Sequence, residues 1–205
     1  AFVAERQTAA AELGTVADLV SSAPHNVTNA LAAAALARSI GVPPVAVRDG
    51  IRAFRPDPHR IAVVATVDGI SYVDDSKATN PHAAQASLSG FEDVVWIAGG
   101  LAKGAEFDSL VPAVRDRLRG VVLIGADRAL LAQALARHAP EVPVVEVSET
   151  DNDVMDRVVA EAAALARPGS TVLLAPACAS MDMFGNYAVR GDAFAAAVRR
   201  HGEQR

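Results

Sequence analysis

Residues 74–81 of the chain read DDSKATNP, and they separate two runs of different character. Ile70–Val73 is an apolar, alternating run that predicts a strand, whereas the Ala-rich run His82–Leu88 predicts a helix. The closing proline suits the first helical turn, and Thr79 or Asn80 is a natural N-cap. We therefore expect a short polar loop between a strand and a helix, which is where α/β proteins place anionic ligands.

The side chains of this loop suit such a ligand. The carboxylates of Asp74 and Asp75 could hold ribose hydroxyls or a metal, and the ammonium group of Lys77 could hold a phosphate or a carboxylate. The alternative is a solvated loop in which the threonine or the asparagine only caps the helix. The composition of the loop leaves both interpretations open.

The bulk composition favours a globular protein of the cytoplasm. With 205 residues the chain is long enough for one ordinary domain and part of another. Its net charge of −5 argues against a nucleic-acid binder, whose surface would carry a basic face. The sequence has no apolar run of the roughly 20 residues that cross a bilayer and no signal peptide at its start. Because residue 1 is not Met, we expect the chain to be part of something longer.

The single cysteine, Cys178, cannot form an internal disulfide, which fits a reducing compartment. No histidine neighbours it in sequence, and free cysteine is among the most buried residue types. We interpret it as a small buried residue rather than a nucleophile.

The first quarter of the chain is expected to be the tail end of a preceding domain. Residues 1–24 show weak periodicity, and Thr15–Val20 suits a short strand or part of a helix. Two helices are predicted, over residues 25–39 and 45–54. The proline-rich connector that follows marks a boundary. The predicted domains are residues 1–57 and 58–205.

Three polar side chains near this boundary are candidates for ligand binding. Asn26 and Asn29 are three positions apart, so both face the same side of the first predicted helix. Two such amides could read a purine edge or bind phosphate, and the alternative is that Asn26 only caps the helix. Arg60 stands just before a predicted strand and could clamp a phosphate, although a lone arginine usually forms a surface ion pair.

From residue 61 onward, predicted strands alternate with predicted helices. The strands are residues 61–67, 70–73, 94–98, 121–125, 144–147 and 171–175. The helices are residues 81–88, 107–118, 128–136, 153–166 and 188–200, followed by a frayed tail. Asp68-Gly69 is a strong hairpin signal. This order predicts an α/β fold with a Rossmann-like, mostly parallel sheet, an initial β-hairpin and helices on both faces.

Three loops that follow strands carry polar groups, namely residues 74–80, 99–106 and 176–182. In a parallel sheet they should converge on one crevice. Lys77 and Lys103 would make this crevice locally cationic on an acidic protein, which suits a small anionic ligand. For Lys103 the alternative is a solvated turn.

Four segments, in this order, resemble the D-glutamate-adding branch of the Mur ligase family. They are HNVTNA at 25–30, PHR at 58–60, DSKATN at 75–80 and PACASMDMF at 176–184. The resemblance covers the chain from about residue 15 onward. Mur ligases have three domains, and the central one carries the ATP P-loop. This chain has no P-loop motif, so it looks like the end of the central domain followed by the C-terminal Rossmann-like domain. The resemblance implies that it is inactive alone.

The resemblance also implies an activity. Enzymes of this branch join D-glutamate to UDP-N-acetylmuramoyl-L-alanine through an acyl phosphate, using ATP and Mg²⁺, in peptidoglycan precursor synthesis. The Mg²⁺ ligands would lie mainly in the missing central domain, with no metal ligand in this chain. The protein would be a monomer that binds neither nucleic acid nor membrane. The alternatives are another amino-acid-adding ligase of the Mur or folylpolyglutamate type, and a non-enzymatic nucleotide-binding module. A dinucleotide dehydrogenase is disfavoured because G-x-G-x-x-G is absent.

The site roles that the resemblance implies form two groups. The nucleotide group is Asn26 and Asn29 at the adenine, Arg60 at the phosphates, Asp75 at the ribose, and Lys77, the implied catalytic residue, at the nucleotide or the acyl phosphate. The D-glutamate group is Thr79, Lys103, Ser180, Met181 through its amide, and Tyr187, which stands where the family commonly has another aromatic residue.

Overall fold

The computed structural model describes residues 2–6, 9–19, 24–55, 57–149, 151 and 153–205. The chain divides into two compact units, residues 1–57 and 58–205, which we describe separately. Whether the first unit is the end of a central ATP-binding domain stays a prediction.

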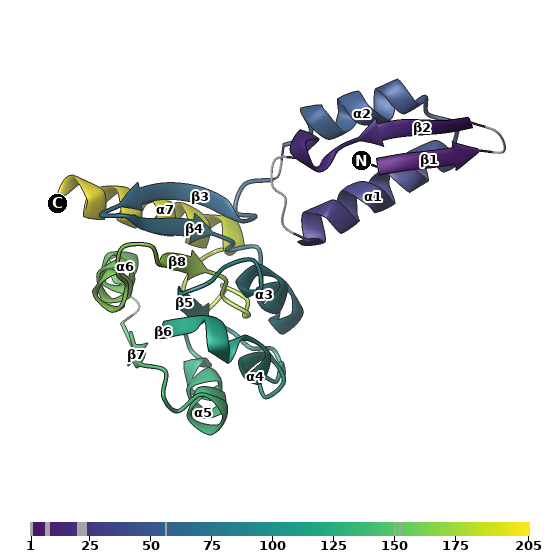
Figure 1. The fold of residues 1–205 in the computed structure, drawn as a ribbon. Helices are drawn as coiled ribbons and strands as arrows, with labels where there is room; N and C mark the ends of the chain where they lie inside the picture. Colours follow the sequence, from purple (N-terminus) through teal and green to yellow (C-terminus); the bar gives the residue numbers. More distant parts are fainter. Residues whose placement is uncertain (1, 7–8, 20–23, 56, 150, 152) are drawn as a thin grey trace. The chain divides into compact units, whose positions relative to one another are not determined.

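The first unit combines a β-hairpin with two helices (Figure 1). Its elements are β1 (Phe2–Arg6), β2 (Ala9–Gly14), the 3₁₀ helix η1 (Val16–Asp18), α1 (Pro24–Ser39) and α2 (Pro44–Ala53). The two helices confirm the sequence prediction. The antiparallel β1–β2 pair was not predicted, because alanine-rich strands give a weak alternation signal. Thr15–Val20 is neither strand nor α-helix over its described part. It forms a 3₁₀ turn in which the Thr15 amide donates to Asp18 Oδ2 at 2.7 Å.

The second unit is built on a six-stranded sheet with strand order β3-β4-β8-β5-β6-β7. The strands are β3 (Ala62–Val67), β4 (Ile70–Asp74), β5 (Val94–Gly99), β6 (Leu118–Ile124), β7 (Val144–Glu146) and β8 (Thr171–Leu174). Only β3 runs antiparallel, as the partner of β4 in the predicted hairpin. Asp68 and Gly69 both have positive φ there, as a tight two-residue turn requires. All other pairs are parallel, which confirms the predicted sheet.

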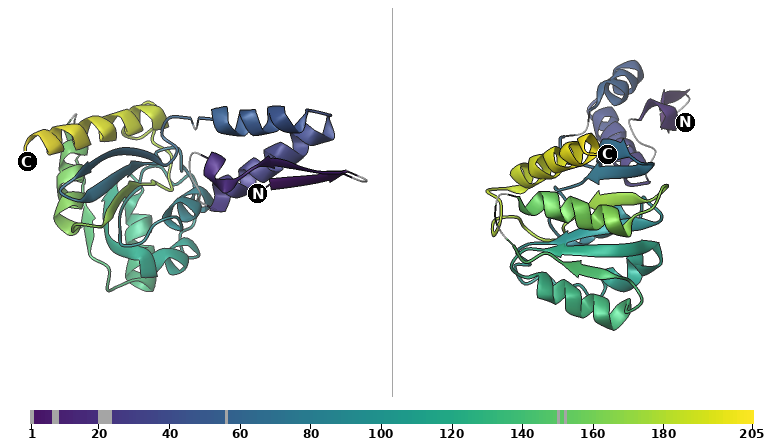
Figure 2. Two further views of the ribbon diagram at one scale, coloured as in Figure 1. Left: turned by 45° about the horizontal axis from the view of Figure 1, so that its top comes forward. Right: turned by 90° about the vertical axis from the view of Figure 1, so that its left-hand side faces the viewer.

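Helices cover both faces of this sheet (Figure 2). They are α3 (Pro81–Leu88), α4 (Leu110–Val114), α5 (Arg128–His138), α6 (Val154–Leu165) and α7 (Tyr187–Glu203). One core joins α3, α4 and α5 to the face that carries Trp96, and the other joins α6 and α7 to the face that carries Ile97. Burial on both faces explains why the central strands read as continuous apolar runs. No helix within the described ranges combines the length and the apolar character that crossing a membrane would need.

Two predicted helix bounds were wrong. The helix expected over residues 107–118 is the single turn α4 followed by the 3₁₀ turn η2 (Arg115–Arg117), because Leu118 already pairs with Val94 in the sheet. The tail expected to be frayed is helical to Glu203. There the ring of His201 lies 6.3 Å from that of the buried Tyr72, so packing extends the helix.

Asp93 ties together the amino ends of three strands. It precedes β5, and its Oδ2 accepts hydrogen bonds from Ser170 Oγ at 2.8 Å and from Arg167 Nε at 3.0 Å. Arg119 of β6 contributes a longer contact at 3.5 Å. Burial raises the pKa of Asp93, but the hydrogen bonds from Ser170 and Arg167 outweigh it, so the pKa lies below its usual value.

We expect Asp93→Asn to lower the free energy of unfolding by about 1–2 kcal/mol at pH 7, because charge-assisted hydrogen bonds are lost. Asn tolerates the positive φ of this position, so the variant isolates the charge. Since folding depresses the pKa, the contribution of Asp93 is present above the unfolded value of about 4 and disappears as the pH falls through the folded value. Urea unfolding should therefore show the gap to wild type beginning to close below about pH 5 and continuing to narrow as the pH falls further below the unfolded value. Asp116→Asn, at an exposed position, is the control. A gap that does not change with pH would contradict this account.

Candidate functional site

Three loops meet at the carboxyl end of the sheet, as the sequence predicted. The loop after β8 lies between the other two. Its Ala177 amide donates to the Ala78 carbonyl at 2.9 Å, and Ala179 exchanges two 2.9 Å hydrogen bonds with Leu101. The loop after β8 is therefore bonded to the loop after β4 on one side and to the loop after β5 on the other.

Two glycines allow this close approach. A Cβ atom at Gly100 would overlap the carbonyl oxygen of Ala179, and one at Gly125 would overlap the Gly100 backbone and lie 2.6 Å from Asp182 Oδ2. Both glycines also have positive φ. The Ala126 amide donates to Asp182 Oδ2 at 2.8 Å, so the loop after β6 joins the same junction. The loops after β4, β8 and β5 thus meet through backbone hydrogen bonds, and the Asp182 side chain adds the loop after β6.

The chain contains two lysines, Lys77 and Lys103, and both lie in these loops. Lys77 is half-buried, and its Nζ lies 4.0 Å from the centre of the Tyr187 ring, which fixes the ammonium group by a cation–π contact. Lys103 is exposed on a turn with φ of +51°. The site therefore offers one held cation and one that is free to move toward an anion.

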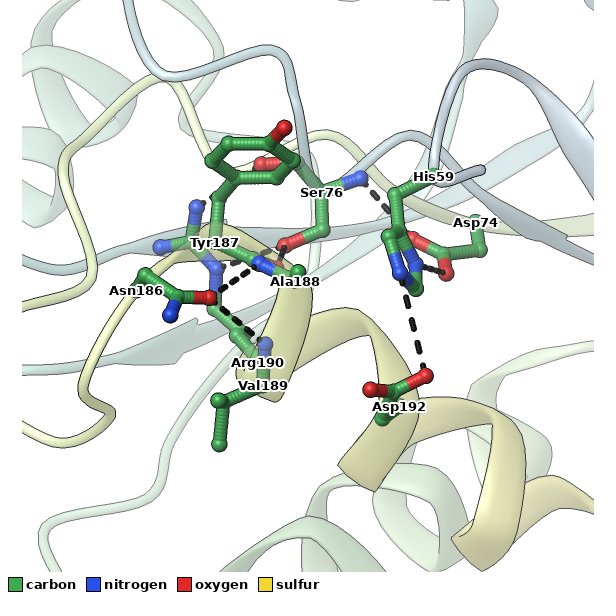
Figure 3. Close-up of polar contacts among 9 residues, drawn as sticks. All are labelled: His59, Asp74, Ser76, Asn186, Tyr187, Ala188, Val189, Arg190 and Asp192. Atoms are coloured by element: carbon green, nitrogen blue, oxygen red, sulfur yellow. Dashed lines mark hydrogen bonds and ion pairs between the residues drawn. The ribbon is translucent and has the colours of Figure 1, made fainter. Parts of the chain in front are cut away.

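His59 fastens the start of the loop after β4 (Figure 3). Its Nδ1 lies 2.6 Å from Oδ2 of the buried Asp74, and its carbonyl accepts a hydrogen bond from the Lys77 amide at 3.1 Å. The other oxygen of Asp74 accepts from the Ser76 amide at 2.9 Å. Gly191 of α7 makes room for the pair, since a Cβ there would overlap His59 Nδ1 and lie 2.7 Å from Asp74 Oδ2.

The remaining sequence-predicted residues of this unit differ in exposure. Asp75 and Ser180 are buried in their loops, and Thr79 is half-buried. Arg60 is exposed, and so is the side chain of Met181 at 68%. Ser180 and Met181 lie in the loop after β8, next to Ala179, whose backbone is bonded to Leu101.

The two asparagines belong to the first unit. Asn26 is half-buried and Asn29 is exposed, both within α1. The alternative that Asn26 caps this helix is wrong, because α1 already begins at Pro24. At the other predicted cap, Asn80 rather than Thr79 serves, since its Oδ1 accepts from the Ala83 amide at 2.9 Å.

Sequence reasoning gave no individual role to His59, Ser76 or Arg190. It considered Asp74 as one of two loop carboxylates for ribose or a metal, and the structure shows this carboxylate buried against His59. Arg190 is 1% exposed, and its hydrogen bonds reach both the loop after β4 and the loop after β8. The sequence signal that could have pointed to Arg190 is its position beside Gly191, in the first turns of a helix that begins shortly after the loop of residues 176–182.

Within the described parts of the chain, no three His, Cys, Asp or Glu side chains gather to hold a metal ion. The described residues on their own therefore do not form a complete Mg²⁺ site.

A family model described as the Mur ligase, glutamate ligase domain matches residues 59–178, which include the loops after β4 and β5 and the first residues of the loop after β8. The chain belongs to the Mur ligase family. Among relatives of this Mur ligase chain, the UDP-N-acetylmuramoylalanine–D-glutamate ligase of Streptomyces avermitilis is 69% identical and that of Thermobifida fusca 66% identical. Each alignment covers 97% of the chain and 43% of the relative. The chain thus spans less than half the length of these relatives.

Solved structures share the fold of this Mur ligase chain. The UDP-N-acetylmuramate–alanine ligase of Thermotoga maritima superposes with a TM-score of 0.64 at 19% identity, covering 91% of this chain and 40% of that one. The folylpolyglutamate synthase of Mycobacterium tuberculosis gives 0.56 at 20% identity, covering 87% and 40%. At such identities the likeness concerns the fold alone. Together with the family match, it agrees with the expected Rossmann-like sheet.

Gly191→Ala should lower the free energy of unfolding by about 1–3 kcal/mol, because the added methyl group must displace His59 from Asp74. Urea unfolding measures the loss. The matched control is Gly202→Ala on the same helix, where the nearest atom is a Val67 methyl group at 3.2 Å that can yield. Equal effects of the two substitutions would show that the His59–Asp74 pair does not depend on this glycine.

Cys178 should resist alkylation in the folded protein, because burial raises the pKa of its thiol to about 12 and hides the sulfur. We expect iodoacetamide at pH 8 to label it only after urea unfolds the chain, as read by intact mass. Rapid labelling of the folded protein would mean that this loop opens readily.

Proposed function

We propose that this chain is the C-terminal part of an ATP-dependent ligase that joins D-glutamate to UDP-N-acetylmuramoyl-L-alanine in peptidoglycan precursor synthesis. The observation that carries the proposal is that both lysines of an acidic chain stand in loops bonded to one central loop at the carboxyl end of the sheet. The names of relatives up to 69% identical support the choice of D-glutamate.

The reaction explains why cations are needed there. In the first step a carboxylate oxygen of the sugar-linked L-alanine attacks the γ-phosphorus of ATP, and ADP leaves. In the second step the amine of D-glutamate attacks the carbonyl carbon of the acyl phosphate, inorganic phosphate leaves and the amine loses a proton. Every reactant is anionic, so preorganised cations and N–H donors must gather negative charge.

On the nucleotide side, Lys77 would contact the phosphates or the acyl phosphate. Its ammonium group is already held over Tyr187, so little ordering is needed when the anion arrives. The carboxylate of Asp75 would accept hydrogen bonds from ribose hydroxyls, and Arg60 would reach the phosphates. In the first unit, Asn26 and Asn29 would lie at the adenine.

On the amino-acid side, Lys103 would pair with a carboxylate of D-glutamate. Thr79, Ser180 and the Met181 amide would hold the amino acid by hydrogen bonds, and the outward Met181 side chain is consistent with an amide role. Tyr187 would form the wall between this subsite and Lys77. This arrangement separates the two ligands while keeping the reacting ends close.

The domain assignment forms part of the proposal. Residues 1–57 would end the central ATP-binding domain, and residues 58–205 would form the C-terminal domain. The P-loop and most Mg²⁺ ligands would lie outside the chain, so it would be inactive alone. The complete enzyme would be a cytoplasmic monomer that gains its rate by bringing amine and acyl phosphate together.

The proposal is tested with the full-length ligase that contains this chain. Phosphate release from ATP is measured with UDP-N-acetylmuramoyl-L-alanine and, in parallel, D-glutamate, L-glutamate, L-lysine or meso-diaminopimelate. We expect turnover with D-glutamate alone. Turnover with another amino acid would overturn the assigned substrate, and ATP binding without any turnover would favour a binding module.

In the same enzyme, Lys103→Ala should raise KM for D-glutamate by about 10-fold or more, because a charge-assisted contact is lost, and change KM for ATP by less than about threefold. Steady-state kinetics with each substrate varied in turn gives both values. Arg115→Ala, at a half-exposed cation outside the loops, is the control. Equal losses for both substrates would defeat the assignment of Lys103.

A further inference from the structure

Arg190 is a buried cation whose hydrogen bonds go to neutral groups, while the carboxylates of Asp182 and Asp74 lie close enough to favour its charge. It lies in the first turns of α7 and is 1% exposed. Its Nε donates to Ser76 Oγ at 3.0 Å, and its Nη2 donates to the Ser76 carbonyl at 3.0 Å (Figure 3). Nη1 and Nη2 reach the Cys178 carbonyl at 3.2 and 3.3 Å. None of the ion pairs found within the described ranges includes Arg190, although a buried charge normally has a charged partner.

These bonds connect two different loops. Ser76 follows β4, and Cys178 follows β8, the strand that pairs with β4 in parallel. The hydroxyl of Ser76 also donates to the Tyr187 carbonyl at 2.7 Å. Ser76 is thus bonded both to Arg190 and to the first residue of α7. One guanidinium group therefore holds together the loop with Lys77 and the loop with Ser180 and Met181.

The chemistry of the guanidinium group suits this task. Burial lowers the pKa of Arg190 to about 10, so the group still carries its charge at neutral pH. Its planar fork directs donors at a hydroxyl and two carbonyls at once. An ammonium group on a flexible stem cannot match that geometry. Because Arg190 is buried, it has no surface with which to touch a substrate.

We propose that Arg190 is a positioning residue that sets the spacing between the loop of residues 74–80, which carries Lys77, and the loop of residues 176–182, which carries Ser180 and Met181. Both ligands can still bind without these bonds, but the amine and the acyl phosphate would meet less often in the productive geometry. The kinetic part of this inference rests on the proposed function, whereas its structural part does not.

The structural part is tested by hydrogen exchange in the full-length ligase. Arg190→Lys keeps the charge and removes the fork, and Arg200→Lys makes the same change at a half-exposed arginine of the same helix, paired with Asp156 at 2.7 Å. We expect Arg190→Lys to speed amide exchange about 10-fold or more in both residues 75–80 and residues 177–181, and Arg200→Lys to change neither. Faster exchange in only one of these loops, or in neither, would overturn the inference. This result is independent of whether D-glutamate is the substrate.

The kinetic part is tested in the same variants. Arg190→Lys should lower kcat by about 10- to 100-fold, while KM for ATP and KM for D-glutamate each change by less than about threefold. The melting temperature and the fraction of folded enzyme are measured alongside, so that a loss of active protein is not read as a loss of kcat. A rise in one KM with kcat unchanged would overturn the inference, because Arg190 would then serve one ligand only.

Ser76→Ala keeps the test decisive if Arg190→Lys does not fold. It removes the hydroxyl between Arg190 and Tyr187 and leaves the bonds of the guanidinium group to the Ser76 and Cys178 carbonyls in place. We expect faster exchange in residues 75–80 and a kcat lowered by about threefold or more. Unchanged exchange and unchanged kcat would overturn the inference. If the wild-type enzyme shows no turnover that depends on D-glutamate, the proposed function fails while the exchange data still judge Arg190.

Discussion

The insertion of β8 between β4 and β5 is the constraint on which the site depends. This strand is the last to appear in the sequence, yet it pairs with β4 on one edge and with β5 on the other. The loop that follows β8 therefore lies between the loops after β4 and β5, which precede it in the sequence by about 100 and about 75 residues. Parallel pairing places all three carboxyl ends at the same edge of the sheet. The local chemistry of each loop becomes useful only through this arrangement.

The loops can approach one another closely because glycines stand at the points of contact. Glycines at positions 100, 125 and 191 remove the side chains that would otherwise separate backbone from backbone, or helix from histidine. Polar side chains then make the remaining contacts. Asp182 accepts a hydrogen bond from the Ala126 amide, and Asp74 contacts the His59 imidazole and accepts a hydrogen bond from the Ser76 amide. The same contacts restrain the backbones of the loops. Loops restrained in this way would suit the proposed site, which would have to hold two anionic ligands apart.

Local patterns in the sequence predicted the parts of this structure that are themselves local. The buried strands, the Asp68-Gly69 turn and the helix after Pro81 all follow from runs of a few residues, and so does the convergence of the loops once the sheet is parallel. The hairpin β1–β2 was missed because alanine carries little strand signal, and the length of α4 was wrong because pairing with β5 recruited Leu118. The partners of Arg190 lie 114 positions away at Ser76 and 12 positions away at Cys178. No spacing rule connects such residues, so only the folded structure shows that the arginine is buried between two loops.

The distribution of cations has a practical consequence. The ion pairs found in the described ranges use arginine and histidine, whereas both lysines of the chain are in the candidate site. An acylating reagent that reacts with primary amines can therefore modify only these two side chains and the chain's own amino terminus. Peptide mapping of the acylated chain then shows which of these amines has reacted. Acylation at Lys77 or Lys103 thus reports directly on the accessibility of one loop of the candidate site.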